Sequence, residues 1–114
     1  MDVSTLEGQE LTAVEFVEDY LRLRFDGPLV TFYEWPSVLL PDFSVSHGEP
    51  EYRNALCAQI GEEVETAELE EGSALTIKLV NEVVLGLSLR EEDLSGPDAG
   101  AFSETGSATD EIEF

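Results

Sequence analysis

The strongest constraint on the fold is an internal repeat, in which GQELTAVEF from Gly8 matches GEEVETAEL from Gly61. In each copy three apolar positions follow the glycine, separated by a step of three residues and then a step of two. They are Leu11, Val14 and Phe16 in the first copy and Val64, Ala67 and Leu69 in the second. Side chains of a regular strand alternate with a period of two. The shared step of three therefore predicts a β-bulge near residues 12–13 and another near residues 65–66.

The repeat continues through LRLRFDGPLV and LTIKLVNEVV, so each copy predicts a three-stranded meander. In the first copy Asp26-Gly27 is a strong signal for a two-residue hairpin loop, because a type I′ turn needs positive φ at both central positions. This loop sets a register that pairs Phe25 with Pro28, Arg24 with Leu29, Leu23 with Val30, Arg22 with Thr31, Leu21 with Phe32 and Tyr20 with Tyr33. In the second copy residues 80–82 mark the turn less well. Its register stays open, with Val83 and Leu85 placed opposite Lys78 and Thr76.

A helix is predicted between the two copies, because Pro50 suits a first helical turn and Gly61 suits a C-terminal cap. Tyr52, Leu56 and Ile60, with Ala55 and Gln59, form its apolar stripe. Residues 36–49 are predicted as mostly loop, with a short strand at residues 43–46. Residues 62–71 are open to two interpretations, a strand or a continuation of the helix, and the repeat favours the strand.

These elements predict one α+β domain over residues 1–102. It contains an antiparallel sheet of about six to seven strands, built from two pseudo-repeated three-stranded meanders, and one short helix between them. Residues 103–114 are predicted to be an acidic, flexible tail, in which Ile112 and Phe114 alternate as in a short edge strand.

The composition limits the classes of partner. An apolar fraction of 42% argues for a folded chain. No stretch is long and apolar enough to span a bilayer, and the N-terminal segment does not resemble a signal peptide. The single Cys57 fits a reducing compartment, so we expect a cytoplasmic protein.

The chain has 26 acidic and 5 basic residues, a formal net charge of −21. This charge disfavours nucleic acid and membrane surfaces and favours a basic protein partner. Solubility in water and adaptation to high salt are the two alternative roles for the acidity.

The turn and core positions resemble those of a small uncharacterised bacterial domain family. The segments that carry the resemblance are Gly8 with Leu11, LRLRFDG, the WP of Trp35-Pro36, YRNALCAQIG, ALTIKL and SGPDAG. They cover most of residues 6–102 and contain no chemical motif, and the VNE turn departs from the pattern. The resemblance implies a toxin-immunity-like role, since some members are presumed to neutralise secreted toxins.

No pattern of catalytic or cofactor-binding residues is found, and we expect neither an enzyme nor a bound cofactor. The chain has no nucleophile elbow and no phosphate-binding glycine loop. Cys57 and His47 are its only Cys and His, and a buried structural thiol is the commoner role for such a cysteine. His47, Glu49 and Glu51 are close in sequence, but one histidine with two carboxylates is a weak pattern for zinc. We expect no metal site.

The first hairpin carries the candidate interaction face, which consists of Tyr20, Arg22, Arg24, Tyr33 and Trp35. Tyr, Trp and Arg are enriched at the energetic centres of protein interfaces. The alternative is that these side chains pack against each other and against nearby glutamates. The predicted function is that of a non-enzymatic acidic interaction protein, an immunity-like binder of a basic partner. The alternative function is a small-ligand or carbohydrate-binding module that uses this face, and a homodimer through the face is a further prediction.

Overall fold

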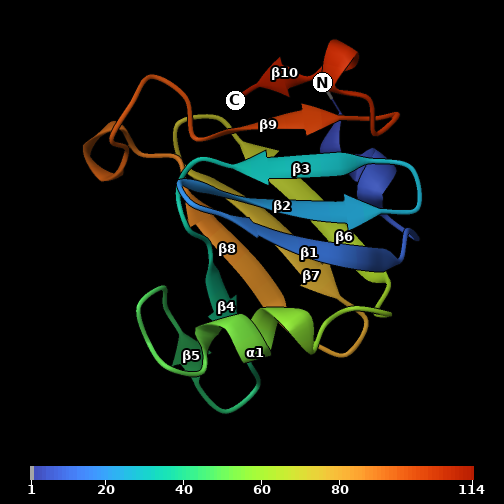
Figure 1. Cartoon of the computed structure of the whole chain (residues 1–114), viewed down its shortest axis with the longest axis vertical. Coiled ribbons are helices and arrows are strands. Elements are labelled where there is room, and N and C mark those ends of the chain that lie inside the picture. Colours follow the sequence, from blue (N-terminus) through green and yellow to red (C-terminus); the bar gives the residue numbers. More distant parts are fainter. Residues whose placement is uncertain (1) are drawn as a thin grey trace.

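The structure is a computed structural model that describes residues 2–114 as two antiparallel five-stranded sheets packed face to face (Figure 1). The first sheet has the order β1-β2-β3-β9-β10 and contains β1 (Leu11–Val17), β2 (Tyr20–Phe25), β3 (Leu29–Phe32), β9 (Gly100–Ser103) and β10 (Ile112–Glu113). The second has the order β5-β4-β8-β7-β6 and contains β4 (Ser37–Leu39), β5 (Ser44–Val45), β6 (Val64–Glu70), β7 (Ala74–Leu79) and β8 (Val84–Ser88). The helices are α1 (Tyr52–Cys57) and the 3₁₀ helices η1 (Val3–Leu6), η2 (Glu91–Asp93) and η3 (Ala108–Asp110).

The prediction of antiparallel sheet structure is confirmed, but the domain is mostly β with little helix rather than α+β. The prediction of a single sheet of six to seven strands is wrong. Each meander forms the larger part of its own sheet, and the two strands that follow it cross to the other sheet. β4 and β5 thus leave β3 and pair beside β8, while β9 and β10 leave β8 and pair beside β3. The repeat therefore contains five strands in each copy, and two of the five are exchanged between the sheets.

Both predicted bulges and the first hairpin register are confirmed. The β1–β2 ladder shifts between Leu11 and Ala13, and the β6–β7 ladder shifts between Val64 and Thr66. Four of the predicted pairs are found between β2 and β3: Leu21–Phe32, Arg22–Thr31, Leu23–Val30 and Arg24–Leu29. The ladder ends there, and the Tyr33 N–H donates to the Ala99 carbonyl at 2.8 Å.

The second hairpin has a three-residue loop, which shifts its register by one residue from the prediction. Val84 lies opposite Lys78, and Gly86 lies opposite Thr76. The Glu82 N–H donates to the Leu79 carbonyl at 3.0 Å, and Glu82 has a φ of 72°. A residue in this left-handed conformation closes a three-residue hairpin loop, so the loop needs no Asp-Gly or Asn-Gly pair.

The two copies meet in a symmetric joint between the start of β1 and the start of β6. The Gly8 N–H donates to the Val64 carbonyl at 2.8 Å, and the equivalent Gly61 N–H donates to the Leu11 carbonyl at 2.7 Å. Glu10 and Glu63 face each other between these bonds as an isolated antiparallel bridge. The repeat is thus a pseudo-twofold relation that closes one corner of the sandwich.

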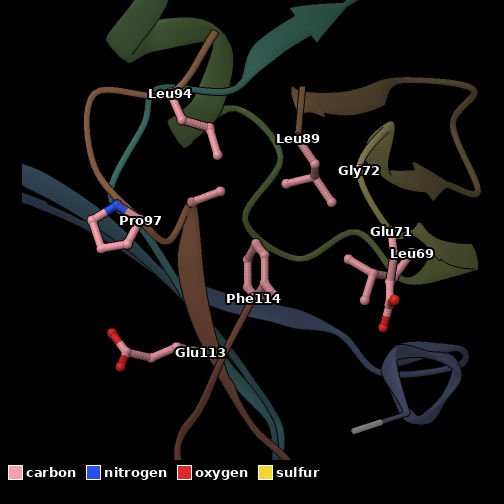
Figure 2. Close-up of a pocket in the computed structure, with 9 residues that line it drawn as sticks. Leu69, Glu71, Gly72, Leu89, Leu94, Pro97, Glu113 and Phe114 are labelled. Atoms are coloured by element: carbon pink, nitrogen blue, oxygen red, sulfur yellow. The ribbon is translucent and has the colours of Figure 1, made fainter. Parts of the chain in front are cut away.

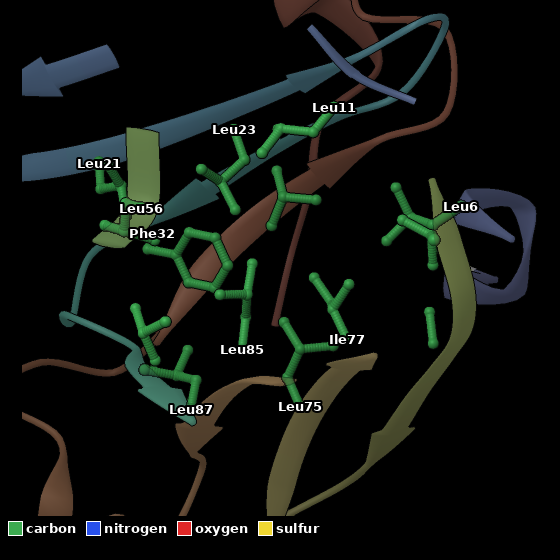
Figure 3. Packing of buried hydrophobic residues seen from close by; sticks show 14 of the residues in the cluster. Leu6, Leu11, Leu21, Leu23, Phe32, Leu56, Leu75, Ile77, Leu85 and Leu87 are labelled. Atoms are coloured by element: carbon green, nitrogen blue, oxygen red, sulfur yellow. The ribbon is translucent and has the colours of Figure 1, made fainter. Parts of the chain in front are cut away.

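The core lies between the sheets, and apolar side chains of the two copies interdigitate there (Figure 3). Leu21, Leu23 and Phe32 of the first sheet and Leu75, Ile77 and Leu85 of the second are each at most 2% exposed. All but Leu85 occupy the alternate positions that the repeat predicts to face inward. Leu85 faces inward because it pairs with Ile77 rather than with Thr76. Burial of this one continuous cluster is the main favourable contribution to the free energy of folding.

The region between the copies departs from the prediction in two places. Residues 37–39 form β4 rather than loop, because the chain crosses here to pair with β8. The helix and the short strand are in their predicted positions as α1 and β5, and residues 64–70 are a strand. The α1 helix ends at Cys57, however, so Ile60 is 46% exposed and does not continue the stripe of Tyr52 and Leu56. The Cys57 side chain is exposed rather than buried.

The segment 103–114, set apart as a tail by its composition, contains the last residue of β9, η3 and β10. The predicted edge strand at residues 112–114 is found as β10, which pairs Ile112 with Phe102 and Glu113 with Ala101. Ser103 donates a short hydrogen bond to Asp110, and Thr105 donates to the same carboxylate at 2.6 Å. These bonds lower the pKa of Asp110.

Candidate functional site

Three of the five predicted face residues lie together on the outer side of β2. The guanidinium of Arg22 lies 5.1 Å above the Tyr20 ring. The neighbouring Arg24 donates to Glu15 of β1 at 2.7 Å, and this ion pair is about 40% exposed on both sides. Exposed ion pairs of this kind contribute little to stability. The Arg22 Nε is buried without a hydrogen-bond partner in the described residues.

Tyr33 and Trp35 are placed apart from this group. The Tyr33 hydroxyl donates to Glu113 of β10 at 3.2 Å, and partial burial together with this bond raises the pKa of Tyr33. Trp35 instead packs against the core. The candidate face is therefore divided: Tyr20 stays with the arginines, whereas Tyr33 contacts β10 and Trp35 packs against the core.

Trp35 belongs to an aromatic cluster beside α1. The imidazole of His47 lies parallel to the indole with ring centroids 4.2 Å apart, and the Phe16 and Tyr52 rings lie 6.5 and 6.4 Å from it. The buried Tyr52 hydroxyl donates to the Pro36 carbonyl, and burial raises the pKa of Tyr52. A sugar-binding platform needs a free aromatic face. His47 already covers one face of Trp35, and the carbohydrate-binding function stays a prediction.

The structure does not join the residues considered for catalysis or metal binding into a centre. His47 is exposed, and its ring lies against those of Trp35 and Tyr52. Within residues 2–114 no group of three or more His, Cys, Asp or Glu side chains is arranged to hold a metal ion.

A different site lies at the end of the sandwich where β6, β9 and β10 converge. An apolar pocket of about 280 Å³ is found here, and Figure 2 shows the Phe114 ring with Leu69, Leu89, Leu94 and Pro97 around it. Gly72 and Ala99 complete the apolar lining, and Glu71 and Glu113 supply its carboxylates. Pockets that bind ligands or anchor residues have this composition, mainly apolar with a few polar groups.

Backbone pairing holds Phe114 at this position. The Ala99 N–H donates to the Phe114 carbonyl at 2.7 Å, and the Phe114 N–H donates to the Gly100 carbonyl at 3.0 Å. A Cβ atom on residue 100 would lie 2.7 Å from the Phe114 ring and would overlap the Thr31 carbonyl. Only glycine allows the strand and the ring to approach this closely.

Carboxylates surround the pocket. A groove of about 550 Å³ shares Leu69 and Glu71 with it and is also lined by Asp2, Glu68 and Glu70. On the other side a hollow that shares Leu89, Leu94 and Pro97 with the pocket is lined by Glu91, Glu92 and one cation, Arg90. The two salt bridges found in residues 2–114 join Glu15 to Arg24 and Glu65 to Lys78. We call the pocket together with Asp2, Glu68, Glu70, Glu71 and Glu113 the acidic pocket site.

The sequence analysis missed most of this site. It left residues 62–71 open between a strand and a helix and placed Phe114 in the tail, and it gave Leu89, Leu94 and Pro97 no role in a site. Their apolar character in polar surroundings was the available signal. Nothing local to the sequence indicates that β9 crosses to the first sheet, and that crossing is what brings these residues to Leu69.

Comparison of the chain with protein-family models, curated proteins and solved structures finds no match. The resemblance to an uncharacterised bacterial family therefore stays a prediction. In the described part of the chain, no helix has the length and apolar character needed to cross a membrane.

Proposed function

We propose that this chain is a non-enzymatic interaction protein that binds a basic protein partner at the acidic pocket site. The observation that carries the proposal is the arrangement of Glu68, Glu70, Glu71 and Glu113 around an apolar pocket, without an intramolecular ion pair to any of the four in the described residues. An apolar centre with a charged rim is the usual anatomy of a protein interface. The net charge of −21 attracts a basic partner at long range.

One form of this function is neutralisation of a basic toxin, as the resemblance to immunity-like proteins implies. The partner would place an apolar side chain in the pocket and basic side chains on the rim. The rim charges then speed association, while the apolar anchor slows dissociation.

The test is binding of the purified chain to the basic proteins encoded next to its own gene, measured by titration calorimetry at about 50 mM and about 500 mM salt. We expect binding that weakens as salt rises. The triple variant Glu68→Gln, Glu70→Gln, Glu71→Gln should lose about tenfold in affinity, since each rim charge contributes a fraction of a kcal/mol.

A second triple variant provides the matched control. Glu18→Gln, Asp19→Asn and Asp42→Asn remove the same number of charges from exposed turns outside the site. This control should change affinity much less than the rim variant does. Equal losses in the two variants would mean that only net charge matters, and absence of binding to every basic neighbour would contradict the proposal.

A further inference from the structure

The acidic pocket site includes the open edge of a sheet. β6 is the last strand of the second sheet and has a partner, β7, on one side. The Ala67 N–H donates to the Glu7 carboxylate at 3.1 Å, so the backbone of Ala67 points away from β7. Backbone direction alternates with a period of two along a strand, and the N–H and carbonyl of Leu69 therefore point outward as well.

In the described residues, hydrogen bonds between this edge and other parts of the chain are found along its first half, up to Ala67. The Val64 N–H donates to the Gln9 carbonyl at 2.9 Å, and η1 lies against β6 beside Ala67. In the described residues no hydrogen bond is found at the outward N–H or carbonyl of Leu69. An uncovered edge of this kind is a template for another strand.

The groove runs along this edge, because residues from both faces of β6 line it. Ala67 and Leu69 belong to the inward face, whereas Glu68 and Glu70 belong to the exposed outer face. A strand added at Leu69 would also alternate its side chains between these two faces. One set would point toward the apolar pocket and the other toward the glutamates.

We propose that the partner segment is an extended strand with alternating apolar and basic residues, which pairs with the edge of β6 at Leu69. Its apolar side chain enters the pocket beside Phe114, and its Lys or Arg side chains lie against Glu68 and Glu70. Strand addition gives affinity through the main chain and specificity through alternate side chains. This inference rests on the proposed function and adds the conformation and sequence pattern of the partner.

The probe is the synthetic peptide Lys-Thr-Lys-Leu-Lys-Thr-Lys, titrated into the full chain and followed by calorimetry and by the backbone amide signals of Leu69 and Gly72. We expect both signals to shift and the Leu69 amide to become protected from hydrogen exchange. A peptide of the same composition with the alternation scrambled should bind more weakly. Replacement of the central Leu by Ala removes three carbon atoms from the pocket and should weaken binding by tenfold or more, since each buried carbon contributes about 0.8 kcal/mol.

Two N-methylated peptides separate strand pairing from charge attraction. One carries methyl groups on the amides of the two inner Lys residues, and the other carries them on the two Thr amides. The N–H groups of successive residues point to opposite sides of a strand, so the Lys amides and the Thr amides lie on opposite edges of the peptide. One methylated peptide should therefore lose about tenfold or more in affinity and the other should not. Equal affinities of the two peptides, whether retained or lost in both, would overturn strand pairing, as would failure of the parent peptide to bind.

The two proposals fail in different ways. If a basic protein partner binds with the expected rim dependence but the two methylated peptides behave alike, strand addition is wrong and the proposed function stands. If the rim variant binds basic partners as tightly as the control variant does, the proposed function itself is wrong.

Discussion

At the scale of single residues, Tyr52 shows how one polar atom in the core positions a helix. The side chain is 2% exposed, and its hydroxyl donates to the Pro36 carbonyl, which ties α1 to the connection between β3 and β4. Replacement by Phe keeps the ring but leaves that carbonyl without its donor. We expect Tyr52→Phe to lower the free energy of unfolding by about 1–2 kcal/mol at pH 7, measured by urea denaturation.

The same substitution has a signature in pH. Burial raises the pKa of Tyr52 above the value of about 10 that a tyrosine has in the unfolded chain. As pH rises past 10 the unfolded state releases this proton first, so the stability of the wild type should fall progressively as the pH is raised above about 10. Tyr52→Phe should show a shallower fall, whereas Tyr20→Phe, which changes a half-buried ring outside the core, should not. An identical alkaline slope in all three proteins would contradict the role of Tyr52.

At the scale of elements, the second hairpin has a non-glycine residue in the left-handed conformation that closes its loop. Glu82 has a φ of 72°, a conformation that glycine adopts without a steric penalty. We expect Glu82→Gly to raise the free energy of unfolding by about 1 kcal/mol, measured by thermal and urea denaturation. Glu82→Ala is the control, because it removes the same charge and keeps the Cβ atom. If both variants gain equally, charge relief rather than backbone strain is the cause.

Elements with local signals could be predicted from the sequence, and elements that depend on distant pairing could not. The two bulges and the first hairpin register follow from apolar spacing and from Asp26-Gly27, and the structure has them as predicted. β4 has three residues, and β9 is buried on both faces, so neither shows alternation. An alternating pattern also shows which face of a strand is buried but not which sheet receives it. For that reason both the two-sheet arrangement and the acidic pocket site were missed.

At the scale of the whole molecule, the exchange of strands makes each half of the chain depend on the other. Residues 1–47 contain β1 to β5, and residues 48–114 contain α1 and β6 to β10. Each sheet takes three strands from one half and two from the other, and the core lies between the sheets. A separate half would leave the inner face of its meander in water, and fragments of 47 and 67 residues bury a smaller fraction of their surface than the whole chain does.

The two halves should therefore fold only together. The chain is divided between His47 and Gly48, in an exposed loop that joins β5 to α1. We expect each fragment alone to lack cooperative unfolding and a dispersed amide spectrum, and an equimolar mixture to recover both, because mixing restores the ten-stranded core. Both fragments are acidic, so association should be stronger at about 500 mM salt, where their mutual repulsion is screened.

Cutting between Asp26 and Gly27, within the β2–β3 turn, gives a control pair that splits the first meander instead of separating the repeats. A cooperative transition in either isolated half of the His47–Gly48 pair, or better reassembly of the control pair, would show that the strand exchange does not couple the two halves.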